Sequence, residues 1–157
     1  IELDIKWVND LYHNGKKVCG ILTEAVTDFE SGDIQFAVVG IGLNLFEAAG
    51  GYPEELRGIA GGLYADREEA GSLERSRLAA EIVNALLEET KELRLPPEYI
   101  EHNIVPGREI SISDGKTVRK AKALEICPDG RLKVEESDGS LAVLSYGEVS
   151  LIISGYI

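Results

Sequence analysis

The chain has 157 residues, of which 44% are hydrophobic, 28% are charged and 6% are aromatic. This length suits one domain with a small appendage, and the apolar share excludes a disordered chain. Sixteen lysines and arginines face 28 aspartates and glutamates, giving a net charge of −12. General affinity for nucleic acid is disfavoured, because no excess of cations is available to replace phosphate counterions.

Cys19 and Cys127 lack the spacing of a metal site or a redox motif, and each lies in an apolar segment. Free thiols in a reducing cytoplasm fit this pattern better than a disulfide framework. The longest apolar stretch, residues 36–46, falls short of the roughly 20 residues of a membrane helix. We expect a cytoplasmic protein without membrane association. Since the chain opens on Ile1 in strand-like sequence, we also expect it to be the C-terminal part of a longer polypeptide.

The first elements predict a hairpin. Residues 1–12 and 16–25 are typical of strands, and the Asn14-Gly15 pair between them favours a type I′ turn, because both residues tolerate a positive φ. A two-residue loop pairs Tyr12 with Lys17 and Asp10 with Cys19.

In this register, Asp10 and Lys17 become diagonal neighbours on one face, roughly 7–8 Å apart at the backbone, which a lysine side chain spans. Lys16 points to the other face. Gly20 lies inside the second strand, where a missing side chain leaves room for a ligand or another backbone.

The middle of the chain predicts one more strand and two helices. Residues 28–33 form a polar loop, and the nearly continuous apolar run at residues 34–45 predicts a strand buried on both faces. A short helix is expected at Pro53–Leu56. A longer helix, capped by Ser72, is expected to run to about Leu93.

From residue 107 the sequence becomes a series of short strands separated by turn signals such as Pro128-Asp129-Gly130, which predicts a small antiparallel barrel of five strands. Charge divides the chain in the same place. Residues 1–104 hold nine basic and 20 acidic residues, whereas residues 105–157 hold seven and eight. We therefore expect two domains, 1–104 and 105–157, with an α+β fold.

Three motifs carry a family resemblance, at residues 6–10 (KWVND), 15–24 (GKKVCGILTE) and 40–44 (GIGLN). Together with residues 146–150 (YGEVS) they are similar to biotin–protein ligase, and the resemblance covers essentially the whole chain. It implies a class II synthetase-like fold of the biotinyl/lipoyl ligase type, with helices packed on a mixed or antiparallel sheet, and a trailing SH3-like β-barrel. Val8 stands where the family has proline, and we expect this to alter strand stiffness rather than chemistry.

The resemblance also implies a two-step reaction. Biotin and ATP with Mg²⁺ give biotinyl-5′-AMP, and a lysine of a biotin carboxyl carrier protein domain then takes the biotinyl group. A homodimer through an exposed sheet edge is compatible with this family. DNA binding would require an N-terminal winged helix upstream of this chain.

The family's functional residues map onto five positions. Lys17 matches the catalytic lysine that contacts both the biotin carboxylate and the adenylate phosphate. Asp10 matches the aspartate that orients the incoming lysine or accepts its proton. Asn9 is expected at the phosphates or their metal and Asn44 at the adenine, while Gly20 would lie beneath biotin. No residue is predicted to ligate a resident metal.

Plainer interpretations stand beside these roles. Lys17 alone is typical of a solvated strand lysine, Asp10 of its ion-pair partner, and Asn9 of a residue that caps backbone groups. The two glycines of residues 40–42 indicate close strand packing more than a phosphate loop. Trp7 is expected in the core, and nothing near Cys19 except Lys17 would lower its pKa.

The family's Gly-Arg-Gly-Arg loop is not in the sequence and is expected upstream of Ile1, so this chain alone should lack the full active site. Two alternatives remain open. A lipoate–protein ligase shares the fold, the adenylate chemistry and an equivalent lysine. A non-catalytic module would bind a carrier domain without chemistry.

Overall fold

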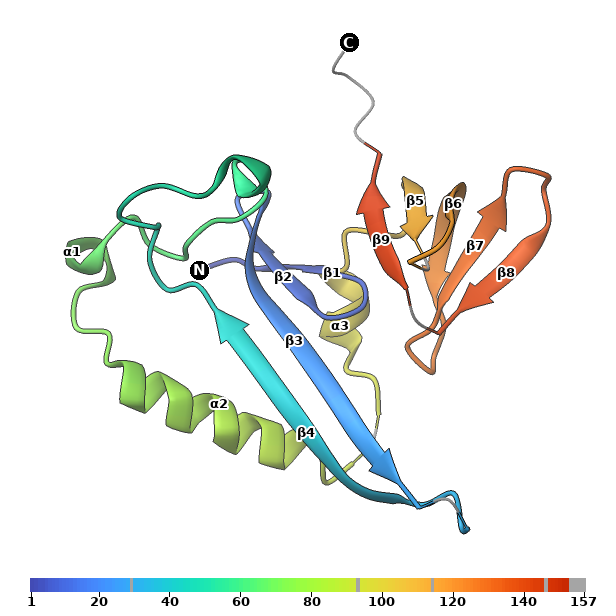
Figure 1. Ribbon diagram of the computed structural model, residues 1–157. Helices are drawn as coiled ribbons and strands as arrows, with labels where there is room; N and C mark the ends of the chain where they lie inside the picture. The colour runs from blue at the N-terminus through green and yellow to red at the C-terminus, as the bar shows by residue number, and fades with distance from the viewer. Residues whose placement is uncertain (29, 93, 114, 146, 153–157) are drawn as a thin grey trace. The chain divides into compact units, whose positions relative to one another are not determined.

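A computed structural model describes residues 1–28, 30–92, 94–113, 115–145 and 147–152 (Figure 1). The chain forms two compact units, Ile1–Glu69 and Ala70–Ile157. Each contains one antiparallel sheet, and a few helices complete the α+β fold that the sequence predicts. The domain boundary at residues 104/105 rests on composition and stays a prediction. None of the described helices is both long and apolar enough to cross a bilayer.

The sheet of the first unit has four strands in chain order: β1 (Asp4–Lys6), β2 (Asp10–His13), β3 (Lys16–Thr27) and β4 (Ile34–Leu43). Each strand pairs antiparallel with the next. At the β2–β3 turn, Asn14 has a φ of 50° and Gly15 a φ of 74°. The predicted hairpin is confirmed, since these are the positive values that a type I′ turn requires.

The first predicted strand is interrupted. Residues 7–9 form a turn between β1 and β2, which pair with Lys6 opposite Asp10. Val8, the residue in place of the family's proline, therefore lies in a turn and not in a strand, so the expected effect on strand stiffness is wrong. Trp7 is buried, as predicted. At the end of this turn, Asn9 bonds through both its backbone and its side chain to Ile21 of β3, which extends the contact between β2 and β3 by one residue.

The predicted register of the hairpin is wrong by one residue beyond the turn. Tyr12 pairs with Lys17 as expected, but Leu11 pairs with Cys19 and Asp10 with Gly20. The register shifts at a bulge between Leu11 and Tyr12, where β3 carries the extra residue Val18. Asp10 therefore faces Gly20 across the strands.

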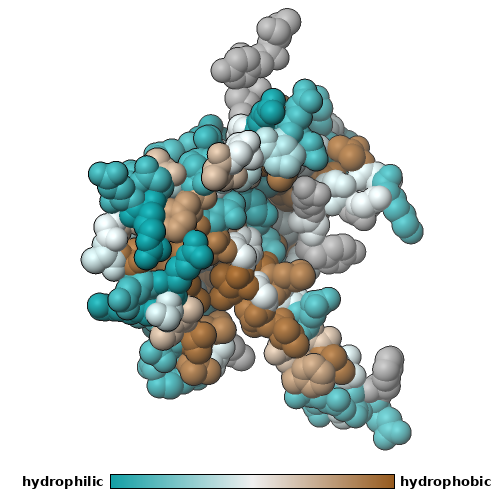
Figure 2. All heavy atoms as spheres, turned by 60° about the vertical axis from the view of Figure 1, so that its left-hand side comes forward, coloured by the Kyte–Doolittle hydropathy of each residue, from teal (hydrophilic) through white to brown (hydrophobic). Residues whose placement is uncertain are grey.

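Strand β4 is exposed, although its apolar sequence predicts burial on both faces. Ile34, Phe36 and Val38 keep 66%, 55% and 57% of their surface accessible. The strand is last in the sheet order and pairs only with β3 in the described residues. Figure 2 shows apolar surface exposed on the face that it draws. A continuous apolar run is typical of a strand that is covered on both faces, whereas the described residues leave β4 exposed.

The helices are shorter than expected. A 3₁₀ turn, η1 (Glu54–Leu56), follows Pro53, and α1 spans Arg67–Ala70. The long helix α2 (Arg75–Glu89) begins after Glu74 and has no side-chain cap, so the expected capping by Ser72 is wrong. Ser72 lies in the turn between α1 and α2. The expected end at Leu93 lies outside the described residues. A short helix, α3 (Pro97–Glu101), follows the proline pair.

The sheet of the second unit contains the five predicted strands: β5 (Glu109–Ser113), β6 (Val118–Ile126), β7 (Leu132–Glu136), β8 (Leu141–Leu144) and β9 (Glu148–Leu151). Their order is β8-β7-β6-β5-β9. Alternate residues build a buried core, which comprises Ile110, Ile112, Ala121, Ala123, Ile126, Leu132, Val134 and Val149. Closure into an SH3-like barrel stays a prediction.

Candidate active site

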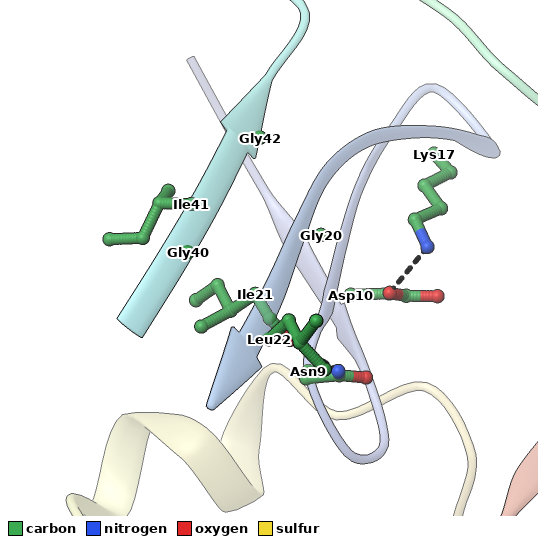
Figure 3. Close-up of a pocket in the computed structure, with 9 residues that line it drawn as sticks. All are labelled: Asn9, Asp10, Lys17, Gly20, Ile21, Leu22, Gly40, Ile41 and Gly42. Atoms are coloured by element: carbon green, nitrogen blue, oxygen red, sulfur yellow. Dashed lines mark hydrogen bonds and ion pairs between the residues drawn. The ribbon is translucent and has the colours of Figure 1, made fainter. Parts of the chain in front are cut away.

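A pocket of about 480 Å³ opens on the sheet of the first unit. This volume is within the range of small-molecule sites. Strands β2, β3 and β4 and the turn before β2 supply its lining, which consists of Asn9, Asp10, Lys17, Gly20, Ile21, Leu22, Gly40, Ile41 and Gly42 (Figure 3). Four of the five site residues predicted from the sequence, Asn9, Asp10, Lys17 and Gly20, therefore line one pocket. The fifth, Asn44, does not line the pocket.

Lys17 and Asp10 form the polar centre of this pocket. Their side chains extend toward each other from β3 and β2 (Figure 3), and Lys17 Nζ lies 2.6 Å from Asp10 Oδ1. The Lys17 side chain is 40% exposed and that of Asp10 is 16% exposed. Such a charge-assisted contact fixes the direction of the ammonium. Because Lys17 remains partly open, its free N–H bonds can also meet an incoming anion.

Lys6 is a second cation beside Asp10, which the sequence analysis missed. Its Nζ lies 4.0 Å from Asp10 Oδ2 and 5.8 Å from the centre of the Tyr12 ring. The signal was present in the KWVND motif, where the lysine precedes the aspartate by four residues. Only the β1–β2 turn, which places Lys6 opposite Asp10, makes the two meet.

Two titratable neighbours of the charged pair, Cys19 and Tyr12, have raised pKa values. Burial raises the pKa of Cys19, the charge of Asp10 raises it further, and the Lys17 ammonium opposes that shift. Burial also raises the pKa of Tyr12, again with help from Asp10. Cys19 is buried, which agrees with its predicted role in packing. Near neutral pH the Cys19 thiol and the Tyr12 hydroxyl therefore stay protonated.

The backbone of Lys17 is held from both sides. On one side it pairs with Tyr12 of β2. On the other, its N–H donates to the Ile59 carbonyl at 2.7 Å and its carbonyl accepts from Gly61 N–H at 2.9 Å, which forms a parallel bridge to Ala60. The loop before α1 thus acts as an extra short strand beside Lys17. No periodic pattern in residues 59–61 indicated this contact.

Asn9 and Asn44 both hold backbone in this structure. Asn9 Nδ2 donates to the Ile21 carbonyl, and Ile21 N–H donates to the Asn9 carbonyl at 2.9 Å. Asn44 Nδ2 donates to the Gly61 carbonyl at 3.1 Å. Gly61 is also the residue that bonds to the Lys17 carbonyl. Asn44 therefore supports Lys17 indirectly, and its expected contact with adenine stays a prediction.

Two glycines of β4 leave one wall of the pocket bare. A Cβ at Gly40 would lie 3.8 Å from the Leu22 carbonyl oxygen, and one at Gly42 would lie 3.8 Å from that of Gly20. These are ordinary contact distances. The expected close packing of strands therefore does not explain why glycine stands at these two positions. Their missing side chains instead leave backbone open to a ligand.

A family model described as "Biotin/lipoate A/B protein ligase family" matches residues 1–44. The "Bifunctional ligase/repressor BirA" of Bacillus subtilis (strain 168) is 32% identical over 157 residues, covering 92% of this chain and 45% of that protein. The protein of the same name from Bacillus spizizenii is 31% identical with the same coverage. This chain therefore spans less than half the length of these relatives.

Solved structures of biotin protein ligase from Aquifex aeolicus share the fold. The match to the apo form has a TM-score of 0.72 at 23% identity. It spans 98% of this chain and 66% of the Aquifex chain. The match to the form in complex with biotin and ATP has a TM-score of 0.70 at 22% identity. It spans 98% of this chain and 63% of the Aquifex chain. The resemblance that the sequence motifs indicate is confirmed by these comparisons.

Proposed function

We propose that this chain is part of a biotin–protein ligase, in which Lys17 stabilises the negative charge formed while biotin is activated by ATP and transferred to a carrier protein. The observation that carries this proposal is the Lys17 ammonium, which is directed by Asp10 at 2.6 Å and exposed in a glycine-walled pocket. The matching family model and the ligases named above support it.

In the first step, a carboxylate oxygen of biotin attacks the α-phosphorus of ATP. The bond between the α-phosphorus and the bridging oxygen breaks, and pyrophosphate leaves with that electron pair. Negative charge gathers between the carboxylate and the α-phosphate. An ammonium fixed at that point stabilises the transition state more than the separated substrates, because it needs no reorganisation. Lys17 is the pocket residue with the charge for this role.

In the second step, the neutral amine of a carrier lysine attacks the acyl carbon of biotinyl-5′-AMP. An amide bond forms, AMP leaves, and the nitrogen loses one proton. Asp10 Oδ2 faces Lys6 at 4.0 Å, while Oδ1 contacts Lys17. We propose that this carboxylate orients the attacking amine or accepts its proton, at the cost of one of these contacts.

Magnesium enters this scheme with ATP as the counter-ion of its phosphates. Among the described residues no group of three or more histidine, cysteine or acidic side chains could hold a metal ion. Asp10, the one carboxylate of the pocket, is paired with lysine ammonium groups. Asn9 at the phosphates and Asn44 at the adenine belong to this proposal.

The activity is proposed for the complete polypeptide, since this chain matches only 45% of the length of its relatives. The partner is the biotin carboxyl carrier domain of a carboxylase, and the compartment is the cytoplasm. A homodimer and DNA binding remain open in this proposal.

The decisive test compares Lys17→Ala with Lys16→Ala in the complete polypeptide. Lys16 is the neighbouring lysine, but it does not line the pocket, and its Nζ lies 3.7 Å from Glu47 Oε1. We expect Lys17→Ala to lower biotin-dependent pyrophosphate release roughly 10²- to 10³-fold, as loss of a transition-state donor does. Lys16→Ala should leave it unchanged. Undiminished release by Lys17→Ala in a folded protein would remove Lys17 from the reaction.

The identity of the acid needs a separate experiment, because the matching family model spans biotin and lipoate ligases alike. Calorimetric titration of the complete polypeptide with biotin and with lipoate should show heat of binding for biotin. Binding of lipoate alone would end the biotin assignment. Binding of a carrier domain without pyrophosphate release from either acid would instead identify a non-catalytic module.

A further inference from the structure

We infer that Gly20 is a positioning residue for Lys17: its missing side chain provides the space through which the Lys17 ammonium reaches Asp10. The sequence suggests a different reason for this glycine, namely a close approach to biotin. The structure shows which atoms occupy the space. The kinetic part of this inference rests on the proposed ligase function, whereas the structural part does not.

A Cβ at position 20 would meet atoms of Lys17 and Asp10. It would lie 3.2 Å from Lys17 Cε, 3.3 Å from Lys17 Nζ and 3.6 Å from Asp10 Oδ1. The first two separations are tighter than nine in ten real Cβ contacts. In Figure 3, Gly20 lies on β3 beside the contact between the two charged groups. The end of the lysine side chain therefore passes over the bare Cα of Gly20.

Backbone conformation does not explain this glycine. Gly20 has no φ in the left-handed region. It lies inside β3 and pairs with Asp10 of β2 and Gly42 of β4. An alanine would adopt the same backbone without strain, and glycine inside a strand weakens the sheet. What position 20 requires is the absence of a side chain.

The bulge at Val18 creates this dependence. Without it, Asp10 would pair with Cys19, as the simple hairpin predicts, and Gly20 would face the other side of the sheet. The extra residue places Asp10 opposite Gly20. Lys17 must then cross position 20 to reach the carboxylate, and a side chain at that position would crowd its Cε and Nζ.

Gly20→Ala should displace the ammonium and preserve the fold. The nearest atoms belong to the flexible end of a lysine, so the side chain can yield by a few tenths of an ångström without moving backbone. That shift is enough to lengthen or bend the contact of 2.6 Å with Asp10. Gly50→Ala is the matched control, since a Cβ there meets nothing within 4 Å and the backbone is not left-handed.

The first measurement is independent of catalysis. In the complete polypeptide, the acetylation of Lys17 by trace acetic anhydride is compared with that of Lys120, an exposed lysine of β6, by mass spectrometry. An amine held against a carboxylate is protected from acylation. We expect Gly20→Ala to raise the relative labelling of Lys17 several-fold, and Asp10→Asn to do the same. Gly50→Ala should have no effect. Unchanged labelling in Gly20→Ala would overturn the inference.

The second measurement asks whether Gly20 acts through the Lys17–Asp10 contact. A small misplacement of a catalytic group costs up to about 10²-fold in rate, so we expect Gly20→Ala to lower kcat for pyrophosphate release by roughly tenfold. The double variant Gly20→Ala/Asp10→Asn should lose much less than the product of the two single losses, because both remove one contact. Fully multiplicative losses would show that Gly20 acts elsewhere and would overturn the inference.

The two proposals fail in different ways. If the unsubstituted protein releases no pyrophosphate with biotin and ATP, the ligase function fails, while the labelling still decides the role of Gly20. If the unsubstituted protein is active and Gly20→Ala matches it in both labelling and kcat, the ligase function stands and the role of Gly20 is refuted.

Discussion

The two units of this chain distribute burial differently. The sheet of the second unit has a core of eight buried apolar side chains from β5, β6, β7 and β9. In the described part of Ile1–Glu69 the buried apolar residues are Trp7, Val18 and Cys19. These lie within or next to the segment that holds Asp10 and Lys17. The buried residues of the second unit form a core across its sheet, whereas those of the first unit lie near the charged pair.

The sharpest test of this contrast is to truncate one apolar side chain in each sheet. Leu132 of β7 is fully buried, whereas Val38 of β4 is 57% exposed. Leu132→Ala should lower the free energy of unfolding by about 2–5 kcal/mol, because it leaves a cavity. Val38→Ala should change it by less than about 0.5 kcal/mol. Urea denaturation measures both, and a large loss for Val38→Ala would show that β4 is covered in solution.

The next test asks whether the first unit is closely packed at Gly62, outside the exposed strand β4. A Cβ at Gly62 would overlap the backbone of Phe46 and Glu47 and lie 2.7 Å from the Phe46 carbonyl oxygen. Gly62→Ala should therefore cost about 1–3 kcal/mol of unfolding free energy. The control Gly50→Ala should be neutral or slightly stabilising. Equal denaturation midpoints for the two variants would mean that this close approach is not rigid.

The charges of the site should be visible in the chemistry of Cys19. Burial and Asp10 raise the pKa of this thiol, while Lys17 lowers it. Because the thiolate is the reactive form, labelling of Cys19 by a disulfide reagent should begin at a higher pH than the labelling of an ordinary thiol. Asp10→Asn should shift the labelling curve to lower pH, and Lys17→Ala should shift it to higher pH. Peptide mapping separates Cys19 from Cys127, and shifts of the same sign would contradict this electrostatic arrangement.

The smallest effect is expected for an ion pair of the second unit. Arg119 Nε lies 3.0 Å from Glu136 Oε1, with side-chain exposures of 40% and 19%. Partly exposed pairs contribute little, so Glu136→Gln should cost less than about 1 kcal/mol by urea denaturation. A loss as large as that of Leu132→Ala would mean that this sheet depends on charge as much as on its apolar core.

Local sequence signals determined much of this protein. Asn14-Gly15 placed a hairpin turn, because few residue pairs accept two consecutive positive φ values. The turn residues after residue 107 placed five short strands, and the motifs at residues 6–24 and 40–44 gave the family resemblance. The meeting of Lys17 with Asp10 also followed from the sequence, since a long lysine side chain tolerates an error of one residue in register.

The tertiary structure decided what depends on contacts distant along the chain. The bulge at Val18 places Gly20 instead of Cys19 opposite Asp10, and the chain turns at residues 7–9, where Asn9 bonds to Ile21. The parallel contact at Ala60 and the indirect support from Asn44 also depend on a loop that carries no periodic signal. Turn geometry and side-chain alternation predict a register, but a bulge shifts that register by one residue and carries no local sequence signal here. For that reason the sequence identified Gly20 as important, and only the structure showed which side chain needs its space.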